Sequence, residues 1–293
     1  MSMGQNYHYY QNYINKDHEC KDEEYNYDQQ NKQNQKSNMK KDEKKKSINQ
    51  SKMNNKSPDR YQYKVLNFDY SLLKPLLSEK KENIVLLVTG SFNPIHRMHI
   101  EILNIAYRHL LSLKKYNIVC GFISPSADCY VKKKQPPLIP FDLRCYMIET
   151  AIREYENENK NNNNLKIFLH RWEGTHDYFI DFPDVIQAIQ NQLSYYFKDI
   201  DIQLVYVCGM DLYDHCNDYF NKNVIVVERK PYKNNKYKDN PDNLIYIVKD
   251  EKSRPFSSTS IRDCYIRRDY IGIKNITFPE VADMVIRFFE NIK

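Results

Sequence analysis

Residues 84–99 read IVLLVTGSFNPIHRMH, and this stretch decides the fold. Its first five residues form a short, continuous apolar run before Gly90, which is typical of a strand buried on both faces. Over residues 97–114 the apolar side chains recur at helical spacing. The stretch therefore predicts a buried strand, a glycine-containing turn and a helix in direct succession.

The same alternation continues along the chain. Apolar runs predict further strands at residues 118–123, 165–169, 204–208, 224–227 and 244–248, and periodicity predicts helices at 141–155, at 185–197 and from about residues 258 and 279. Because apolar strands that alternate with helices form covered parallel sheets, we predict an α/β, Rossmann-like parallel sheet with helices on both faces. Ligands of such sheets bind beyond the carboxyl ends of the strands, so the candidate site is sought there.

Residues 1–60 differ in composition from the rest of the chain. Asn, Gln, Lys and Tyr dominate, and so little apolar surface cannot offset the entropy cost of ordering the segment. We predict a disordered tail over residues 1–60 and one folded domain over residues 61–293. The basic residues 40–46 could serve as a nuclear address, although a solvated charge run explains them more simply. The expected location is therefore cytoplasmic or nuclear.

The overall composition restricts the classes of partner that the protein is expected to bind. A net charge of +6 suits anionic small molecules as well as nucleic acid, but acidic residues are mixed into the basic tail and disfavour nucleic-acid binding. No apolar run approaches the roughly 20 residues of a membrane span, so we expect no membrane partner. The seven cysteines include no C-x-x-C pair, which favours free thiols in a reducing compartment.

The turn after the first strand carries the first candidate site. Gly90 permits close approach of a ligand to the backbone, and His96 and His99 lie on one face at the helix start. Helix N-termini attract phosphate, and two imidazoles there could donate hydrogen bonds to a phosphoryl group. Two capping or surface histidines would be the simpler interpretation. The strand–glycine–turn–helix setting favours phosphate chemistry instead.

A second candidate site is the sequence SSTSIR at residues 257–262. One hydroxyl there is explained as the N-cap of a helix. Four consecutive hydroxyls followed by Arg262 exceed what a cap needs, and a cation is slightly disfavoured at that helix end. A bound polyphosphate would reverse this effect, so the segment predicts a second anion site.

These two motifs resemble the signatures of nucleotidyltransferases with paired histidines, in particular the eukaryotic nicotinamide/nicotinate mononucleotide adenylyltransferases. Further matches are a lysine-rich segment at residues 124–134, which the resemblance makes a loop, the pair Trp172 and Glu173, and CGMD at residues 208–211. The resemblance covers about residues 82–290 and makes residues 61–293 the expected catalytic domain. It implies transfer of AMP from ATP to nicotinamide or nicotinate mononucleotide, without a covalent intermediate. The products would be NAD or deamido-NAD and pyrophosphate.

The resemblance also implies the roles of individual residues. Catalytic roles would fall on His96, His99 and Arg262. ATP would bind Gly90, Ser91, Phe92, Gly209, Asp211, Ser258, Thr259 and Arg262, whereas the mononucleotide would bind Ser91, Lys132, Lys133, Trp172 and Glu173. Trp172 would stack on the cationic pyridine ring, although it could equally be a core residue. Mg²⁺ is expected mainly on the ATP phosphates, since it usually keeps several waters, and a homo-oligomer is a further expectation.

Some positions depart from the family pattern. The family usually has Lys at the position of Ser260 and Asn-Asp at the positions of Arg254 and Pro255, and residues 135–137 extend the lysine-rich segment. The functional lysine among residues 132–134 and the choice between the amide and acid mononucleotide therefore stay open. One alternative is the same chemistry with another substrate, either transfer to pantetheine phosphate or a CTP-dependent reaction, and Met98 and the Trp-Glu pair disfavour both. The other alternative is a non-catalytic nucleotide-binding protein.

Overall fold

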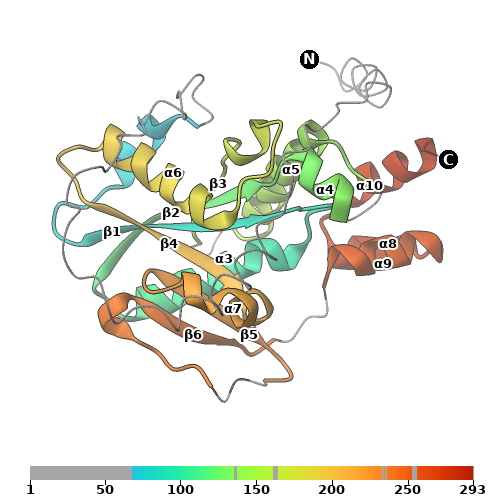
Figure 1. Cartoon of the computed structure of the whole chain (residues 1–293). Helices are drawn as coiled ribbons and strands as arrows, with labels where there is room; N and C mark the ends of the chain where they lie inside the picture. Colours follow the sequence, from blue (N-terminus) through green and yellow to red (C-terminus); the bar gives the residue numbers. More distant parts are fainter. Residues whose placement is uncertain are drawn as a thin grey trace, which may run out of the picture.

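The computed structural model describes residues 68–134, 137–160, 164–232, 234, 236–252 and 256–292, so the predicted tail and nuclear address lie outside the described residues. A sheet of six parallel strands in the order β3-β2-β1-β4-β5-β6 runs through the molecule (Figure 1). The strands are β1 (Glu82–Gly90), β2 (Tyr116–Pro125), β3 (Ile167–Leu169), β4 (Ile202–Gly209), β5 (Val224–Arg229) and β6 (Ile245–Asp250). The predicted α/β, Rossmann-like parallel sheet is confirmed.

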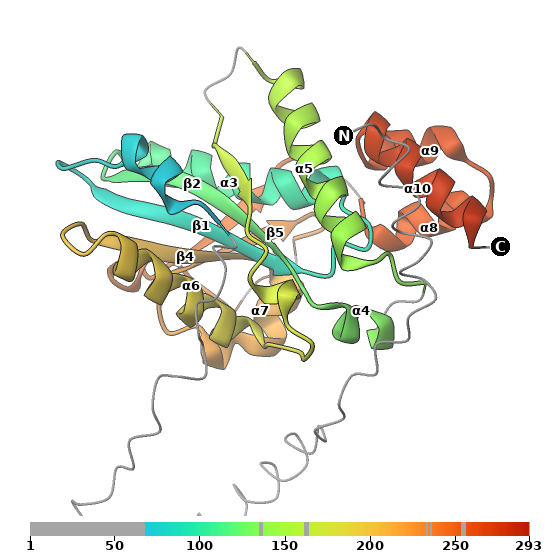
Figure 2. The same ribbon diagram turned by 90° about the horizontal axis from the view of Figure 1, so that it is seen from above.

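Helices cover both faces of this sheet. One face packs against α3 (Arg97–Ser112), α5 (Phe141–Glu158), α8 (Ser258–Ile266), α9 (Tyr270–Ile276) and α10 (Pro279–Asn291). The other packs against the 3-10 helix η2 (Tyr70–Leu76), α6 (Phe182–Tyr196) and α7 (Met210–Cys216). Helices α8, α9 and α10 gather beyond the carboxyl end of β1 (Figure 2). Along the described ranges, no helix is both long and apolar enough to cross a bilayer.

Alternation along each strand divides the core into two clusters. In β1, Ile84 and Leu86 pack on the side of α3, whereas Val85 and Leu87 pack on the side of α6. Successive strand residues point to opposite faces, so a strand covered on both faces needs apolar residues at every position. This requirement explains the continuous apolar runs from which the strands were predicted.

Three α-helices, α4, α7 and α9, differ from the sequence-based expectation. The lysine-rich segment, expected as a loop, forms α4 (Asp128–Lys134), in which Val131 is fully buried and Tyr130 stacks on Phe179 at 4.3 Å between ring centroids. Helix α9 was not predicted, although Asp269 caps it by accepting a hydrogen bond from the Gly272 N–H at 2.8 Å. Helix α7 was not predicted either, and all three helices have only seven residues, too few for apolar periodicity to reveal them.

Candidate active site at the carboxyl ends of the strands

The predicted histidine pair lies where residues 91–96, here called the histidine loop, connect β1 to α3. His96 is the N-cap of α3, and its backbone N–H donates to Nδ1 of His99 at 3.1 Å. The two rings stack with their centroids 3.5 Å apart. Because Nδ1 of His99 accepts this bond, the neutral ring carries its proton on Nε2. That N–H is the donor that a phosphoryl oxygen would need.

The environment keeps both rings neutral. Burial, followed by the charge of Arg229, lowers the pKa of His99 to about 3. Burial also lowers the pKa of His96 well below its ordinary value, with further contributions from His99 and Arg229. Within the described residues, Nδ1 of His96 is buried without a hydrogen-bond partner. An anion bound beside these rings would stabilise their protonated forms and raise both pKa values.

Gly90 and Phe92 lie at the end of β1 and the start of the histidine loop, and Phe92 contacts His99. Phe92 has a φ of 44°, in the left-handed region that non-glycine residues rarely adopt, and its ring lies edge-on to His99 at 4.8 Å. Such a conformation costs on the order of 1 kcal/mol and persists only where the surroundings impose it. A Cβ atom at Gly90 would meet the Phe92 ring at 3.5 Å, an ordinary contact. The protein's own packing therefore does not require glycine at this position.

The hydroxyl-rich residues 257–262 supply their own hydrogen-bond partners. Ser257 caps α8 by accepting from the Ser260 N–H at 3.0 Å, and the two hydroxyls lie 2.7 Å apart. The Thr259 hydroxyl accepts from the Arg262 guanidinium at 3.0 Å. The hydroxyls that are not needed for the cap were predicted to bind a polyphosphate, and those of Thr259 and Ser260 also have partners within the protein.

The same segment holds the histidine loop. The Ser258 hydroxyl donates to the Pro94 carbonyl at 2.8 Å, and the Arg262 guanidinium donates to the Asn93 carbonyl at 2.9 Å. These contacts join segments separated by 164 and 169 residues. The two predicted anion sites thus form one constellation at the carboxyl end of β1.

A buried arginine, not anticipated from the sequence, organises the neighbouring loops. Arg144 in α5 is fully buried and donates to the carbonyls of Ser91 at 2.7 Å, Ser126 at 2.7 Å and Ile139 at 2.9 Å. It also forms an ion pair with Asp128 at 2.8 Å. The segments that follow β1 and β2 are therefore fixed to a single guanidinium. Its spacing from the apolar residues 148 and 151 placed it on the buried face of the helix, a signal available in the sequence.

The Trp-Glu pair lies just beyond β3. Glu173 is buried, and its carboxylate accepts from the Ser124 hydroxyl at 2.8 Å. Burial raises the pKa of Glu173 to about 7, against the opposing effect of hydrogen bonds from Ser126 and Ser124. Trp172 is only 6% exposed, and its ring contacts His176 edge-on at 4.7 Å. Trp172 thus contributes to the core on the α6 side of the sheet.

The other predicted residues lie on exposed parts of the same edge. Lys132 and Lys133 are exposed on α4, whereas the side chain of Lys134 lies outside the described residues. Gly209 ends β4 and is the N-cap of α7, and Asp211 is exposed in the first turn of that helix. These residues therefore share with the histidine loop the edge of the sheet at the carboxyl ends of the strands.

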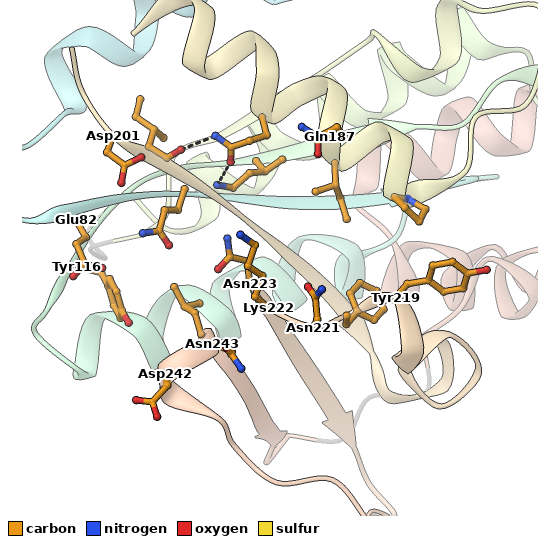
Figure 3. Close-up of a pocket in the computed structure, with 18 of the residues that line it drawn as sticks. Glu82, Tyr116, Gln187, Asp201, Tyr219, Asn221, Lys222, Asn223, Asp242 and Asn243 are labelled. Carbon is orange, nitrogen blue, oxygen red and sulfur yellow. Dashed lines mark hydrogen bonds between the residues drawn. The ribbon is translucent and has the colours of Figure 1, made fainter. Parts of the chain in front are cut away.

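A cavity of about 730 Å³ lies at the opposite edge of the sheet. It opens at the amino ends of the strands, where Glu82, Asp201 and Asn223 line it (Figure 3). The Gln190 amide there bonds the backbone of β4, accepting from the Leu204 N–H at 2.8 Å. None of the predicted site residues lines this cavity. We place the candidate site at the histidine loop, where the predicted residues of two distant segments meet.

Comparison with known proteins shows which proteins this chain resembles. Over 117 residues the chain is 33% identical to nicotinamide/nicotinic acid mononucleotide adenylyltransferase 1 of Bos taurus, covering 40% of this chain and 37% of that protein. It is 29% identical over 133 residues to nicotinamide/nicotinic acid mononucleotide adenylyltransferase 2 of Caenorhabditis elegans, covering 45% and 54%. It is 25% identical over 137 residues to nicotinamide/nicotinic acid mononucleotide adenylyltransferase of Arabidopsis thaliana, covering 46% and 52%.

The alignments thus span between about a third and a half of the lengths of these relatives. Residues 87–264 match the model of the cytidylyltransferase-like family. The matched range includes both the histidine loop and residues 257–262. The chain belongs to the cytidylyltransferase-like family and is a nucleotidyltransferase.

Proposed function

We propose that this protein joins the adenylyl group of ATP to nicotinamide or nicotinate mononucleotide and releases pyrophosphate. The observation that carries the proposal is the contact of Ser258 and Arg262 with the histidine loop. It supports a single phosphate site that contains both motifs of the sequence. The names of the relatives support the choice of acceptor.

The reaction would be a direct displacement. A phosphate oxygen of the mononucleotide attacks the α-phosphorus of ATP, and a new P–O bond forms. The bond between the α-phosphorus and the bridging oxygen breaks, and pyrophosphate leaves with that electron pair. No covalent chemistry is required of the protein, so positioning and charge stabilisation provide the rate enhancement.

The His96–His99 pair would act on the phosphate at which charge develops. The Nε2–H of His99 would donate to the α-phosphate or the leaving oxygen, and the N-terminus of α3 adds its positive dipole. Thr259 is exposed and Arg262 partly exposed, so both could contact the β- and γ-phosphates. The Ser258 hydroxyl already donates to Pro94, so we assign it the positioning of the histidine loop.

The remaining roles follow the edge of the sheet. Backbone N–H groups around Gly90, Ser91 and Phe92 would contact the phosphates, and Gly209 and Asp211 the ATP ribose. Lys132 or Lys133 would neutralise phosphate charge, and the mononucleotide would bind near Trp172 and Glu173.

Mg²⁺ would arrive with ATP, bound by phosphate oxygens and water. Among the described residues, no group of three or more His, Cys, Asp or Glu side chains could hold a metal ion. An ion that takes most of its ligands from the nucleotide and from water would need few ligands from the protein. The ion would offset the charge of the phosphates during transfer.

The decisive experiment measures pyrophosphate release from ATP and Mg²⁺ with nicotinamide mononucleotide, nicotinate mononucleotide or phosphopantetheine added separately, and repeats each assay with CTP. We expect release with ATP and at least one pyridine mononucleotide, and the ratio of the two rates gives the preferred acceptor. Release with phosphopantetheine or with CTP alone would contradict the proposal. Folded protein that releases pyrophosphate in no assay would point to a non-catalytic nucleotide-binding protein.

A further inference from the structure

Arg229 is the last residue of β5, at the same edge of the sheet as the histidine loop. In the sheet, β5 pairs with β4, which in turn pairs with β1. The register places Val227 beside Gly209, the last residue of β4, so Arg229 extends two residues beyond that level. Its side chain therefore starts at the rim where the phosphate site is proposed.

The alternation of β5 determines the face on which Arg229 lies. Ile225 and Val227 pack in the core on the side of α3, and Arg229 follows at the same period of two. Helix α3 contacts β5, and the first turn of α3 carries His99. Glu228 points to the other face, where it is buried and accepts from the Asn234 N–H at 2.6 Å.

The Arg229 guanidinium is available for a ligand. Its side chain is exposed, and it forms no hydrogen bond or ion pair with any residue in the described part of the chain. Its charge nevertheless acts on both rings of the pair, since it lowers the pKa of His96 and of His99. A positive charge beside two neutral imidazole rings favours an anion there, and an arginine can bind a phosphate through two parallel hydrogen bonds.

We propose that Arg229 is a phosphate-binding residue of the ATP site and binds the β- and γ-phosphates. This inference rests on the proposed function and adds to it a further cationic residue beside Arg262 and the lysines of α4. The neighbouring Lys230 is held differently, because its amine donates to the Glu251 carbonyl at 3.0 Å.

The test compares full-length wild type with Arg229→Gln, Arg229→Lys and the matched control Lys230→Gln, which removes the same charge one residue later. Isothermal titration with inorganic triphosphate measures the phosphate site without any acceptor. For Arg229→Gln we expect Kd to rise about tenfold or more, equivalent to about 1.4 kcal/mol. The Kd of Arg229→Lys should lie between those of Arg229→Gln and the wild type, because lysine keeps the charge and lacks the planar guanidinium. Lys230→Gln should stay within about twofold of wild type.

In steady-state assays Arg229→Gln should raise KM for ATP and leave KM for the mononucleotide within about twofold. Triphosphate binding by Arg229→Gln equal to that of wild type would overturn the inference, and so would an equal loss in Lys230→Gln. Because the titration uses no acceptor, it separates two failures. Loss of triphosphate binding in Arg229→Gln, with no turnover of either pyridine mononucleotide by wild type, would refute the proposed acceptor and uphold the role of Arg229.

Discussion

His96 and His99 are neutral at the start of α3, because burial and the charge of Arg229 both lower their pKa values. A neutral ring can donate one hydrogen bond, and the bond from the His96 N–H to Nδ1 leaves Nε2–H of His99 as that donor. The side chain is fixed by the protein itself, so little reorganisation would be needed during the proposed adenylyl transfer.

Replacement of His99 by alanine should remove this donor and leave the fold intact. We expect kcat to fall by about 10²-fold or more, as for loss of a donor that acts in the transition state. Steady-state kinetics with ATP and the preferred mononucleotide measure the effect. His109→Gln, in the last turn of the same helix, is the control and should retain turnover. Near wild-type kcat in His99→Ala would show that the histidine loop is not the reaction centre.

Replacement of Arg144 by methionine should destabilise the protein strongly. The change leaves three backbone carbonyls without their donor and Asp128 without its ion-pair partner. Breaking a buried pair in this way costs roughly 3–5 kcal/mol, measurable by urea unfolding. Arg153→Met is the matched control on α5, because the Arg153–Glu280 pair is exposed and should contribute less than about 1 kcal/mol. A loss as small as that of the control would mean that Arg144 does not hold these loops.

Single residues could be proposed from the sequence where their type alone suggests the chemistry. His96, His99 and Arg262 were candidates because imidazoles at a helix start and an arginine after four hydroxyls are unusual patterns, and their roles stay predictions. Arg144 was missed although its spacing from residues 148 and 151 placed it on the buried face of its helix, because its hydrogen bonds to three loop carbonyls arise only from tertiary packing. Arg229 was not a candidate, because only the sheet register places it at the rim near the histidine loop. Trp172 shows the converse: its burial fits a core residue, and its assignment to the mononucleotide stays a prediction.

Helix α8 connects the stability of the fold with the proposed phosphate site. Its cap, Ser257, keeps the first turn formed, and that turn carries Ser258 and Arg262 onto the histidine loop. Helix α9 has a comparable cap, Asp269, in its first turn, whereas its contact with the histidine loop lies at its other end, where the Thr277 hydroxyl donates to the Ile95 carbonyl at 2.9 Å. The two helices therefore allow a test that separates local unfolding from damage to the site.

Ser257→Ala and Asp269→Ala should each cost about 1 kcal/mol in the free energy of unfolding, the usual effect of losing an N-cap. Only Ser257→Ala should also raise KM for ATP, because Ser257 caps the turn that carries Ser258 and Arg262 onto the loop, whereas Asp269 caps the end of α9 away from Thr277. Urea unfolding and steady-state kinetics on both variants measure the two effects. An equal rise in KM in Asp269→Ala would indicate a general loss of stability and no special role for α8.

Strands and long helices followed from the sequence, whereas short helices did not. Every predicted strand exists, because burial on both faces demands continuous apolar runs such as residues 84–88. Helix α4 was mistaken for a loop because its three lysines suggest solvent, although the buried Val131 and the Tyr130–Phe179 stack hold it. The surroundings stabilise this helix, and no pattern within seven residues shows it.

The balance of buried titratable groups sets how the whole molecule responds to pH. Burial lowers the pKa of His170 to about 3, as it does that of His99, and the pKa of His96 also lies well below 6.5. Below about pH 6.5 the unfolded chain takes up protons at these positions and the native state does not, so stability is lost as pH falls. Glu173 acts in the opposite direction between about pH 4.5 and 7, because its raised pKa lets the native state bind a proton.

Three histidines therefore outweigh one glutamate, and the free energy of unfolding should decrease from pH 7 to pH 5. Each histidine contributes up to about 1.4 kcal/mol per pH unit. Urea unfolding at pH 7.5, 6.5 and 5.5 measures the slope. His170→Gln should reduce the change of unfolding free energy with pH by the contribution of one histidine. The change that remains in this variant is then due mainly to the His96–His99 pair. Stability that is constant or rises toward pH 5.5 would contradict the buried neutral state of these rings.

The hydrogen bonds that hold the histidine loop have a consequence for the order of protein synthesis. The loop is bound by Ser258, Arg262 and Thr277, which follow their partners by 164, 169 and 182 residues. At roughly 5–20 residues per second, a ribosome reaches these partners about 10 to 40 seconds after it has made the loop. During that interval the growing chain contains both histidines and lacks the bonds that position them. A product released before α8 would thus carry the recognisable motif of a nucleotidyltransferase without its assembled phosphate site.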